Sequence, residues 1–87
     1  MGIELDMYKI KCKNNNINLN YITTIYDAQI VHKLEELGCS KCNGDSRIIF
    51  EIDGYTLNEN KNLLQKHNSL ANYVFDDEDW YECRMYF

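Results

Sequence analysis

The stretch LGCSKCNGD at residues 37–45 decides how so short a chain holds together. Its two cysteines, Cys39 and Cys42, come after the predicted end of a helix and are followed by Asn43-Gly44. A Cys-x-x-Cys pair on a tight turn can supply two of the four ligands of a tetrahedral zinc ion. The glycine after the pair allows backbone N–H groups to turn toward the sulfur atoms. The pattern favours half of a zinc site, with a redox pair or two ordinary buried thiols as the alternatives.

The other half of this zinc site has to come from the two remaining cysteines, Cys12 and Cys83. Each lies on the apolar face expected for its strand, so both can approach the pair if the first and last strands are neighbours. We therefore predict one structural zinc ion held by four thiolates. The predicted ligands are Cys12, Cys39, Cys42 and Cys83.

Two general properties of cysteine define the alternatives to this zinc site. Free cysteine is among the most buried residue types, so Cys12 and Cys83 can also be small core residues without a metal. Redox Cys-x-x-Cys pairs usually open a helix, where the helix dipole favours the thiolate. The pair at residues 39–42 follows a helix instead, which disfavours a redox role.

Length and composition predict one compact domain spanning residues 1–87. Chains of this size bury only about two-thirds of their unfolded surface, so the core often needs a metal, a disulfide or a partner. The sequence is 45% hydrophobic and contains no proline, and we find no repeat or linker in it. The first ten residues carry acids and no long apolar run, and no stretch approaches the ~20 apolar residues of a membrane span. We expect a cytoplasmic protein, where thiols stay reduced and clustered cysteines favour metal chemistry.

The first half of the chain predicts a β-hairpin followed by a helix. Residues 7–13 and 17–24 alternate between apolar and polar side chains around a turn at residues 14–16. The side chains expected to face inward from the first strand are Tyr8, Ile10 and Cys12. A helix is predicted over residues 24–38, with Thr24 and Asp27 resembling a capping box and Gly38 at the end. Its apolar stripe is Ile30, Val31, Leu34 and Leu37.

The second half predicts a further hairpin, a second helix and a closing strand. Asp53-Gly54 is a favoured two-residue turn within residues 47–58, and Asn58 can cap a helix that follows. Residues 71–75 form a possible short strand. The side chains expected to face inward from the closing strand are Tyr81, Cys83, Met85 and Phe87. The predicted fold is therefore α+β, a small zinc-stabilised antiparallel sheet of four to five strands with two helices.

Charge is concentrated at the end of the chain. The formal net charge is −5, and residues 68–87 contain five acids and one base. Net acidity argues against direct nucleic-acid binding, because phosphate recognition depends on basic patches. Aromatic residues beside these acids are typical of a protein-binding hot spot, whereas the plain alternative is a solvated turn. The predicted contacts with a basic partner are Asp76, Asp77, Glu78, Asp79, Trp80 and Glu82.

The sequence carries none of the common catalytic motifs. It has no nucleophile elbow, no phosphate-binding loop and no His-Glu-x-x-His zinc motif. A divalent-metal nuclease could use Asp76, Asp77 and Asp79, but adjacent carboxylates on one short turn rarely converge on a single ion. We therefore expect that the protein is not an enzyme.

The chain's overall character resembles that of phage-encoded anti-CRISPR proteins. It is small, acidic and rich in aromatic residues, and 34 of its 87 residues are Asn, Lys, Ile or Tyr, which AT-rich codons encode. Among inhibitors of the type II CRISPR effector nuclease, one family is a zinc-containing metalloprotein, and the four cysteines fit that kind. The resemblance implies a stoichiometric protein that binds this nuclease in the bacterial host cell and blocks DNA loading or cleavage.

The nuclease has a strongly basic DNA channel, which complements an acidic ligand. The alternative is a small zinc-stabilised adaptor or regulator that binds another basic protein. A zinc-ribbon nucleic-acid binder would rely on Lys9, Lys11 and Lys13, which the net charge of −5 disfavours.

Overall fold

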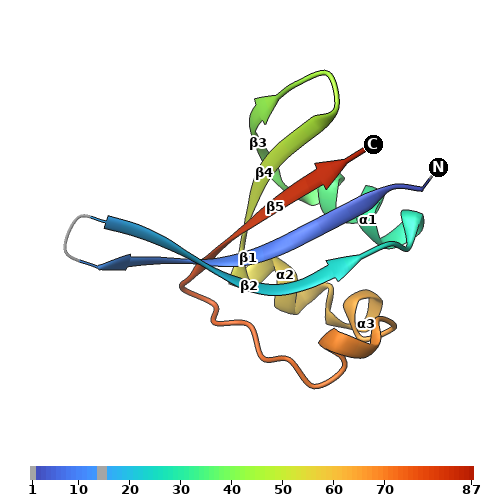
Figure 1. The fold of residues 1–87 in the computed structure, drawn as a ribbon. Helices are drawn as coiled ribbons and strands as arrows, with labels where there is room; N and C mark the ends of the chain where they lie inside the picture. Colours follow the sequence, from blue (N-terminus) through green and yellow to red (C-terminus); the bar gives the residue numbers. More distant parts are fainter. Residues whose placement is uncertain (1, 14–15) are drawn as a thin grey trace.

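A computed structural model describes residues 2–13 and 16–87, apart from the side chains of Cys12 and Lys13. The strands are β1 (Glu4–Lys13), β2 (Asn16–Ile25), β3 (Cys39–Asn43), β4 (Arg47–Asp53) and β5 (Trp80–Tyr86). The helices are α1 (Ala28–Leu37), α2 (Gly54–Glu59), α3 (Lys61–Leu64) and the short 3₁₀ helix η1 (Asn68–Leu70). All neighbouring strands pair antiparallel in one sheet of order β2-β1-β5-β4-β3 (Figure 1). The predicted α+β class is confirmed, with five strands and, within the described ranges, three α-helices where two were expected.

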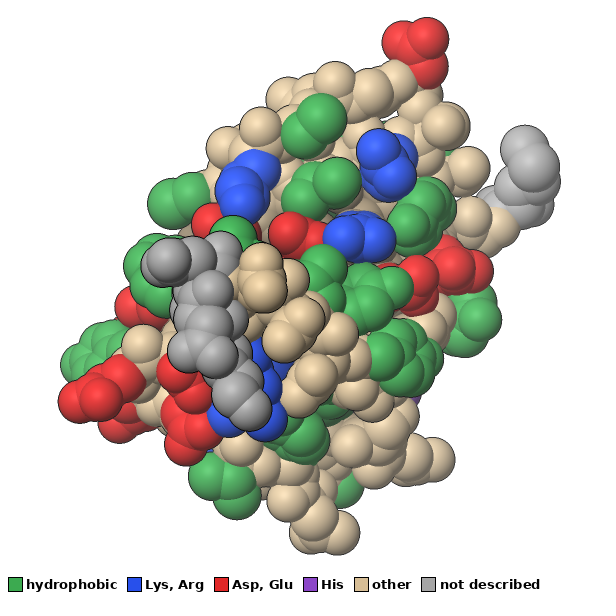
Figure 2. Space-filling view, turned by 60° about the vertical axis from the view of Figure 1, so that its left-hand side comes forward, with side chains coloured by type: hydrophobic (Ala, Val, Ile, Leu, Met, Phe, Trp, Pro, Cys, Tyr) green, Lys and Arg blue, Asp and Glu red, His purple; other side chains and the backbone are tan. Residues whose placement is uncertain are grey.

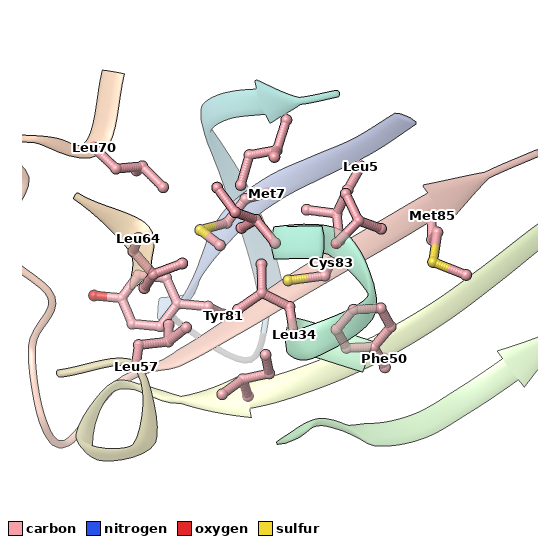
Figure 3. Packing of buried hydrophobic residues seen from close by; sticks show 14 of the residues in the cluster. Leu5, Met7, Leu34, Phe50, Leu57, Leu64, Leu70, Tyr81, Cys83 and Met85 are labelled. Atoms are coloured by element: carbon pink, nitrogen blue, oxygen red, sulfur yellow. The ribbon is translucent and has the colours of Figure 1, made fainter. Parts of the chain in front are cut away.

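The hydrophobic core lies between the helices and one face of the sheet, and the opposite face is open (Figure 1). The central strand β5 contributes Tyr81, Cys83 and Met85, all of them buried as predicted. Figure 3 shows Cys83 close to Leu34 of α1. The Tyr81 ring lies beside Leu57 of α2 and Leu64 of α3. The remaining core side chains are Leu5, Met7, Ile25, Ile30, Val31, Phe50, Ile52, Leu70 and Phe75.

The inward face of β1 is the opposite of the predicted one. Leu5 and Met7 are fully buried, whereas Tyr8 and Ile10 are only half-buried and lie on the open face. The alternation itself is real, but Lys9 and Lys11 continue the core face past the point where helices cover it. Because a strand has a period of two, an error of one residue exchanges the two faces.

Helix α1 is shorter than predicted at its start. Thr24 lies in β2, where its hydroxyl donates to Asp6 Oδ1 at 2.7 Å, and Asp27 alone caps the helix. The Asp27 carboxylate accepts from the N–H groups of residues 29 and 30. Gly38 ends the helix as predicted. Its φ of −88° is accessible to any residue, so glycine is needed here for space, because a Cβ would lie 2.4 Å from Phe50 Cδ2. The apolar stripe is confirmed, with Ile30, Val31 and Leu34 buried and Leu37 packed against them.

The predicted hairpin at Asp53-Gly54 is wrong, because β4 runs directly into α2. The Asp53 carboxylate accepts from Thr56 N–H at 3.2 Å and thus caps a helix rather than starting a turn between strands. Asn58 lies inside α2 instead of capping a helix of its own, and a turn at Asn60 separates α2 from α3.

The sheet also contains a hairpin that was not predicted. β3 pairs with β4 around a turn at residues 44–46, so the cysteine pair lies on an edge strand and not on a tight turn. The strand suggested at residues 71–75 is absent there, since this described segment is irregular. Phe87 follows the end of β5 and is 59% exposed, not inward. None of the helices within the described residues is long and apolar enough to cross a lipid bilayer.

Candidate functional site

Residues 76–79 form a turn, here named the acidic turn, that leads into β5. The Asp79 N–H donates to Asp76 O at 3.1 Å and closes the turn. The Gly54 N–H donates to Asp79 O at 2.8 Å, and the Asp76 N–H donates to Tyr81 Oη at 2.9 Å. The carboxylates of this turn therefore project from a backbone that hydrogen bonds fix on both sides.

The contact with Gly54 depends on the absence of a side chain. A Cβ at this position would lie 1.7 Å from Asp76 O and 2.6 Å from Asp76 C, which is shorter than any real contact. Glycine at the first residue of α2 thus allows the helix and the acidic turn to touch, backbone against backbone.

Tyr81 and Asn58 attach the acidic turn to the core. The Tyr81 ring is buried and packs edge-to-face on Phe75, with ring centroids 5.2 Å apart. Burial raises the pKa of Tyr81, so its hydroxyl stays neutral and can accept from the Asp76 N–H. Asn58 Nδ2 donates to Phe75 O at 2.9 Å and also to the Asp77 carboxylate. The turn is consequently anchored from α2 and from β5.

Lys9 of β1 neutralises part of the acidic turn. Its Nζ forms an ion pair with Asp76 and another with Asp79 Oδ2 at 3.1 Å, and its side chain is only 18% exposed. Hydrogen bonding to these two carboxylates raises the pKa of Lys9, and the bond to Lys9 lowers the pKa of Asp76. Because Tyr8, Ile10 and Cys12 were expected to face inward, Lys9 was expected to face solvent. Leu5 and Met7 lie on the same face of β1 as Lys9, and these two apolar residues could have placed it inward.

A pocket separates the acidic turn from the hairpin arm. The hairpin arm is the part of β1 and β2 beyond Lys9, which pairs with no third strand among the described residues. This arm projects from the sheet in Figure 1, and Figure 2, turned so that it comes forward, shows acidic and basic side chains together beside it. The pocket has a volume of about 530 Å³. Its lining residues are Lys9, Ile10, Lys11, Asn18, Glu78, Asp79 and Trp80. Charges of both signs thus border one hollow beside an aromatic ring.

The structure brings five of the six predicted contact residues together at this place. Asp76, Asp77, Glu78 and Asp79 form the turn, and Trp80, which is 48% exposed, follows them into β5. Glu82 differs, because it is 9% exposed on the open face of the sheet and accepts from Arg84 Nε at 2.7 Å. Its charge is already paired with Arg84, so Glu82 offers little to a partner.

The cysteines predicted to share a zinc ion are not brought together. Cys39 and Cys42 are exposed on β3, and they pair with Glu51 and Ile49 on the open face. Cys83 is fully buried on the core face, where burial raises its thiol pKa and keeps it protonated. The side chain of Cys12 lies outside the described residues.

The three described cysteines do not fit one tetrahedral site. β3 and β5 are separated by β4, which places their backbones roughly 10 Å apart, and the thiols point to opposite faces. Thiolates on one zinc ion lie about 4 Å from one another, given Zn–S bonds of about 2.3 Å. Within the described part of the chain, no group of three or more His, Cys, Asp or Glu side chains could hold a metal ion.

No protein-family model matches this chain, and no curated protein or solved structure matches it either. The interpretation of the acidic turn and of the cysteine strand therefore rests on their own residues and geometry.

Proposed function

We propose that this chain is a stoichiometric binding protein that presents the acidic turn to a basic protein surface. The observation that carries the proposal is a fixed turn of four acids beside a half-exposed tryptophan and a pocket. A binding surface that is already ordered loses less conformational entropy on association than a mobile one. Tryptophan is also among the residues that most often dominate binding energy.

Asp77 and Glu78 are the acids of the turn that are best suited to meet a basic partner. Among the side chains that the structure describes, no Lys or Arg pairs with either of them, whereas Asp76 and Asp79 share Lys9. Their negative charge faces solvent and can attract a basic surface over a distance of about 10 Å at moderate salt. We assign long-range attraction to Asp77 and Glu78 and the apolar contact to Trp80.

The partner in this proposal is the type II CRISPR effector nuclease in the cytoplasm of a bacterial host cell. Its guide-loaded form holds nucleic acid in a positively charged channel. A protein that offers closely spaced carboxylates to this channel competes with DNA phosphates, whose binding rests on the same basic side chains. The activity that follows is inhibition of DNA loading or of cleavage, without catalysis and without direct binding of nucleic acid.

The test is a DNA-cleavage assay with the guide-loaded nuclease and increasing amounts of this protein. The informative variant is Asp77→Asn with Glu78→Gln, which removes two charges and leaves both Lys9 ion pairs intact. Its matched control is Glu35→Gln with Glu36→Gln, which removes the same charge from the exposed side of α1. Those two acids form only surface pairs with His32 and Lys33, which contribute little to stability.

We expect wild type and the α1 control to inhibit cleavage at equimolar amounts and the turn variant to require a large excess. Equal inhibition by the turn variant and wild type would show that the acidic turn is not the contact. Failure of wild type to bind the nuclease at all would reject the partner.

A further inference from the structure

Cys39 and Cys42 lie on the same face of β3, which a regular strand does not allow for residues three apart. Cys39 pairs with Glu51 and Cys42 pairs with Ile49, so their partners on β4 are two residues apart. Residues two apart on a strand point to one face. The extra residue that makes this possible is Lys41, at the bulge between Ser40 and Cys42. The bulge therefore turns a Cys-x-x-Cys sequence into a pair of thiols on one surface.

This pair of thiols is exposed at the edge of the sheet. β3 is the last strand in the sheet order, and all of its residues are exposed. Both thiols are free. Within the described residues, no other strand pairs with the outer edge of β3, so its backbone N–H and C=O groups there can pair with a further strand.

Two thiolates make only half of a tetrahedral zinc site, and the described residues offer no completion within the chain. Cys83 is buried on the opposite face, and Glu51, which lies opposite Cys39 on β4, forms an ion pair with Lys41 Nζ at 3.3 Å. A closed structural zinc site needs four ligands. The missing ligands must come from another molecule, and a second copy of this chain carries the same pair on the same kind of edge.

We propose that one zinc ion joins two copies of this chain, held by Cys39 and Cys42 of each. Antiparallel pairing of the two β3 edges about a two-fold axis places Cys39 opposite Cys42 of the second copy, with all four thiols on one face. Residues that face each other across two strands have Cβ atoms about 5 Å apart, a gap that cysteine side chains can close onto one ion. Such an isologous contact closes on itself and leaves no further half-site.

Charge at β3 suits this centre. Zn²⁺ with four thiolates carries a net charge of −2, and each copy places Lys41 between its two cysteines. Two lysines therefore lie beside the two negative charges, each half exposed and each also paired with Glu51 of its own chain. With no open coordination position, the zinc ion links the chains and does not catalyse a reaction.

The test is zinc titration of the reduced, metal-free protein, followed by light scattering for mass and elemental analysis for metal. We expect one zinc per two chains, a mass twice the 10.4 kDa of one chain, and a return to monomer on chelation. Cys39→Ser and Cys42→Ser, both at exposed positions, should stay folded and lose both zinc and dimer. Cys83→Ala is the control and should keep both, because the buried thiol is not a ligand.

Four results would overturn the proposal. These are one zinc per monomeric chain, no zinc bound by the reduced protein, loss of zinc in folded Cys83→Ala, and a dimer that reductant alone dissolves. The last result would mean that a disulfide, and not a metal, joins the chains. None of these outcomes depends on the acidic turn, so failure here leaves the proposed partner contact untouched.

Discussion

The acidic turn and strand β3 are both exposed, yet the chain holds them in different ways. The turn is fixed by Gly54, Asn58 and Tyr81 and is partly neutralised by Lys9. Among the strands that the structure describes, only β4 pairs with β3, and all residues of β3 are exposed. Exposure alone therefore does not identify how a surface is used. A surface fixed by its own chain is ready to meet a partner as it stands, whereas an unpaired edge is completed by one.

Glycine substitution should show the largest difference in stability between the acidic turn, at Gly54, and the β3 region, at Gly44. Gly54→Ala places a Cβ 1.7 Å from Asp76 O, so either α2 or the acidic turn must move. We expect a loss of about 3 kcal/mol in the free energy of unfolding, measured by urea denaturation. The control is Gly44→Ala in the turn after β3, where the Cβ would be 3.5 Å from Arg47 O and should cost less than about 1 kcal/mol. Similar losses in both variants would contradict the close contact at Gly54.

Removal of Trp80 should weaken binding more than stability. Trp80→Ala truncates the half-exposed ring that borders the pocket, and we expect a loss of about 2 kcal/mol in binding free energy to the nuclease by calorimetry. Tyr26→Ala removes another exposed ring, 67% exposed between β2 and α1, and serves as the control. If both variants bind like wild type, Trp80 is not an anchor.

Asn58 should contribute more to the free energy of unfolding than Asn43, a comparable polar residue on β3. Asn58→Ala removes the hydrogen bonds to Phe75 O and to Asp77, and leaves a partly buried carbonyl without its donor. We expect a loss of about 1–2 kcal/mol in unfolding free energy. Asn43→Ala removes only an exposed bond from Ser40 Oγ, so its cost should be below about 0.5 kcal/mol. A reversed order would mean that the turn is not held by α2.

The Lys9 ion pairs should make stability depend on pH in a defined direction. The pKa of Asp76 is lowered in the folded state, so its contribution is present above the unfolded pKa of about 3.9 and disappears as pH falls through the folded value. The pKa of Lys9 is raised, so its contribution persists below about pH 10.4 and disappears as pH rises through the folded value.

Thermal unfolding across pH 2–7 should therefore show a smaller acid-induced loss of stability in Asp76→Asn than in wild type. Asp45→Asn, in the exposed turn after β3, is the control and should follow the wild-type curve. Identical curves for wild type and Asp76→Asn would mean that the pair with Lys9 does not form in solution.

The sequence predicted the parts of the fold that depend on local periodicity. The apolar stripe of α1 follows the helical period and is confirmed. Tyr81, Cys83 and Met85 follow the strand period and are buried as predicted, whereas Phe87 comes after the end of β5 and is exposed. Residues 7–13 alone indicate the wrong face of β1, because Tyr8 and Ile10 fall on one face and the lysines fall on the other. Only the neighbouring Leu5 and Met7 distinguish the two phases, and the long-range pairing of Lys9 with Asp76 stabilises the observed one.

The errors after β4 have a different cause. Asp53-Gly54 suits a hairpin and also suits a helix start. The acidic turn decides between them, because Asp76, 22 residues later in the chain, packs on Gly54. The sequence likewise located the acidic residues but not what fixes them, because Asn58 and Lys9 reach them only in the folded chain. The prediction of one zinc site for four cysteines took no account of the bulge at Lys41, which leaves Cys39 and Cys42 on an edge strand, away from Cys83.

Amide hydrogen exchange, on the free protein and on its complex with the guide-loaded nuclease, distinguishes a fixed contact surface from a solvated turn. In the free protein, we expect slow exchange at the Asp76 and Asp79 amides, whose hydrogen bonds fix the acidic turn. In the complex, we expect added protection at residues 77–80 and no change on the exposed side of α1. Unprotected Asp76 and Asp79 amides in the free protein, or protection gained on α1 and not at the turn, would contradict a fixed contact surface at the turn.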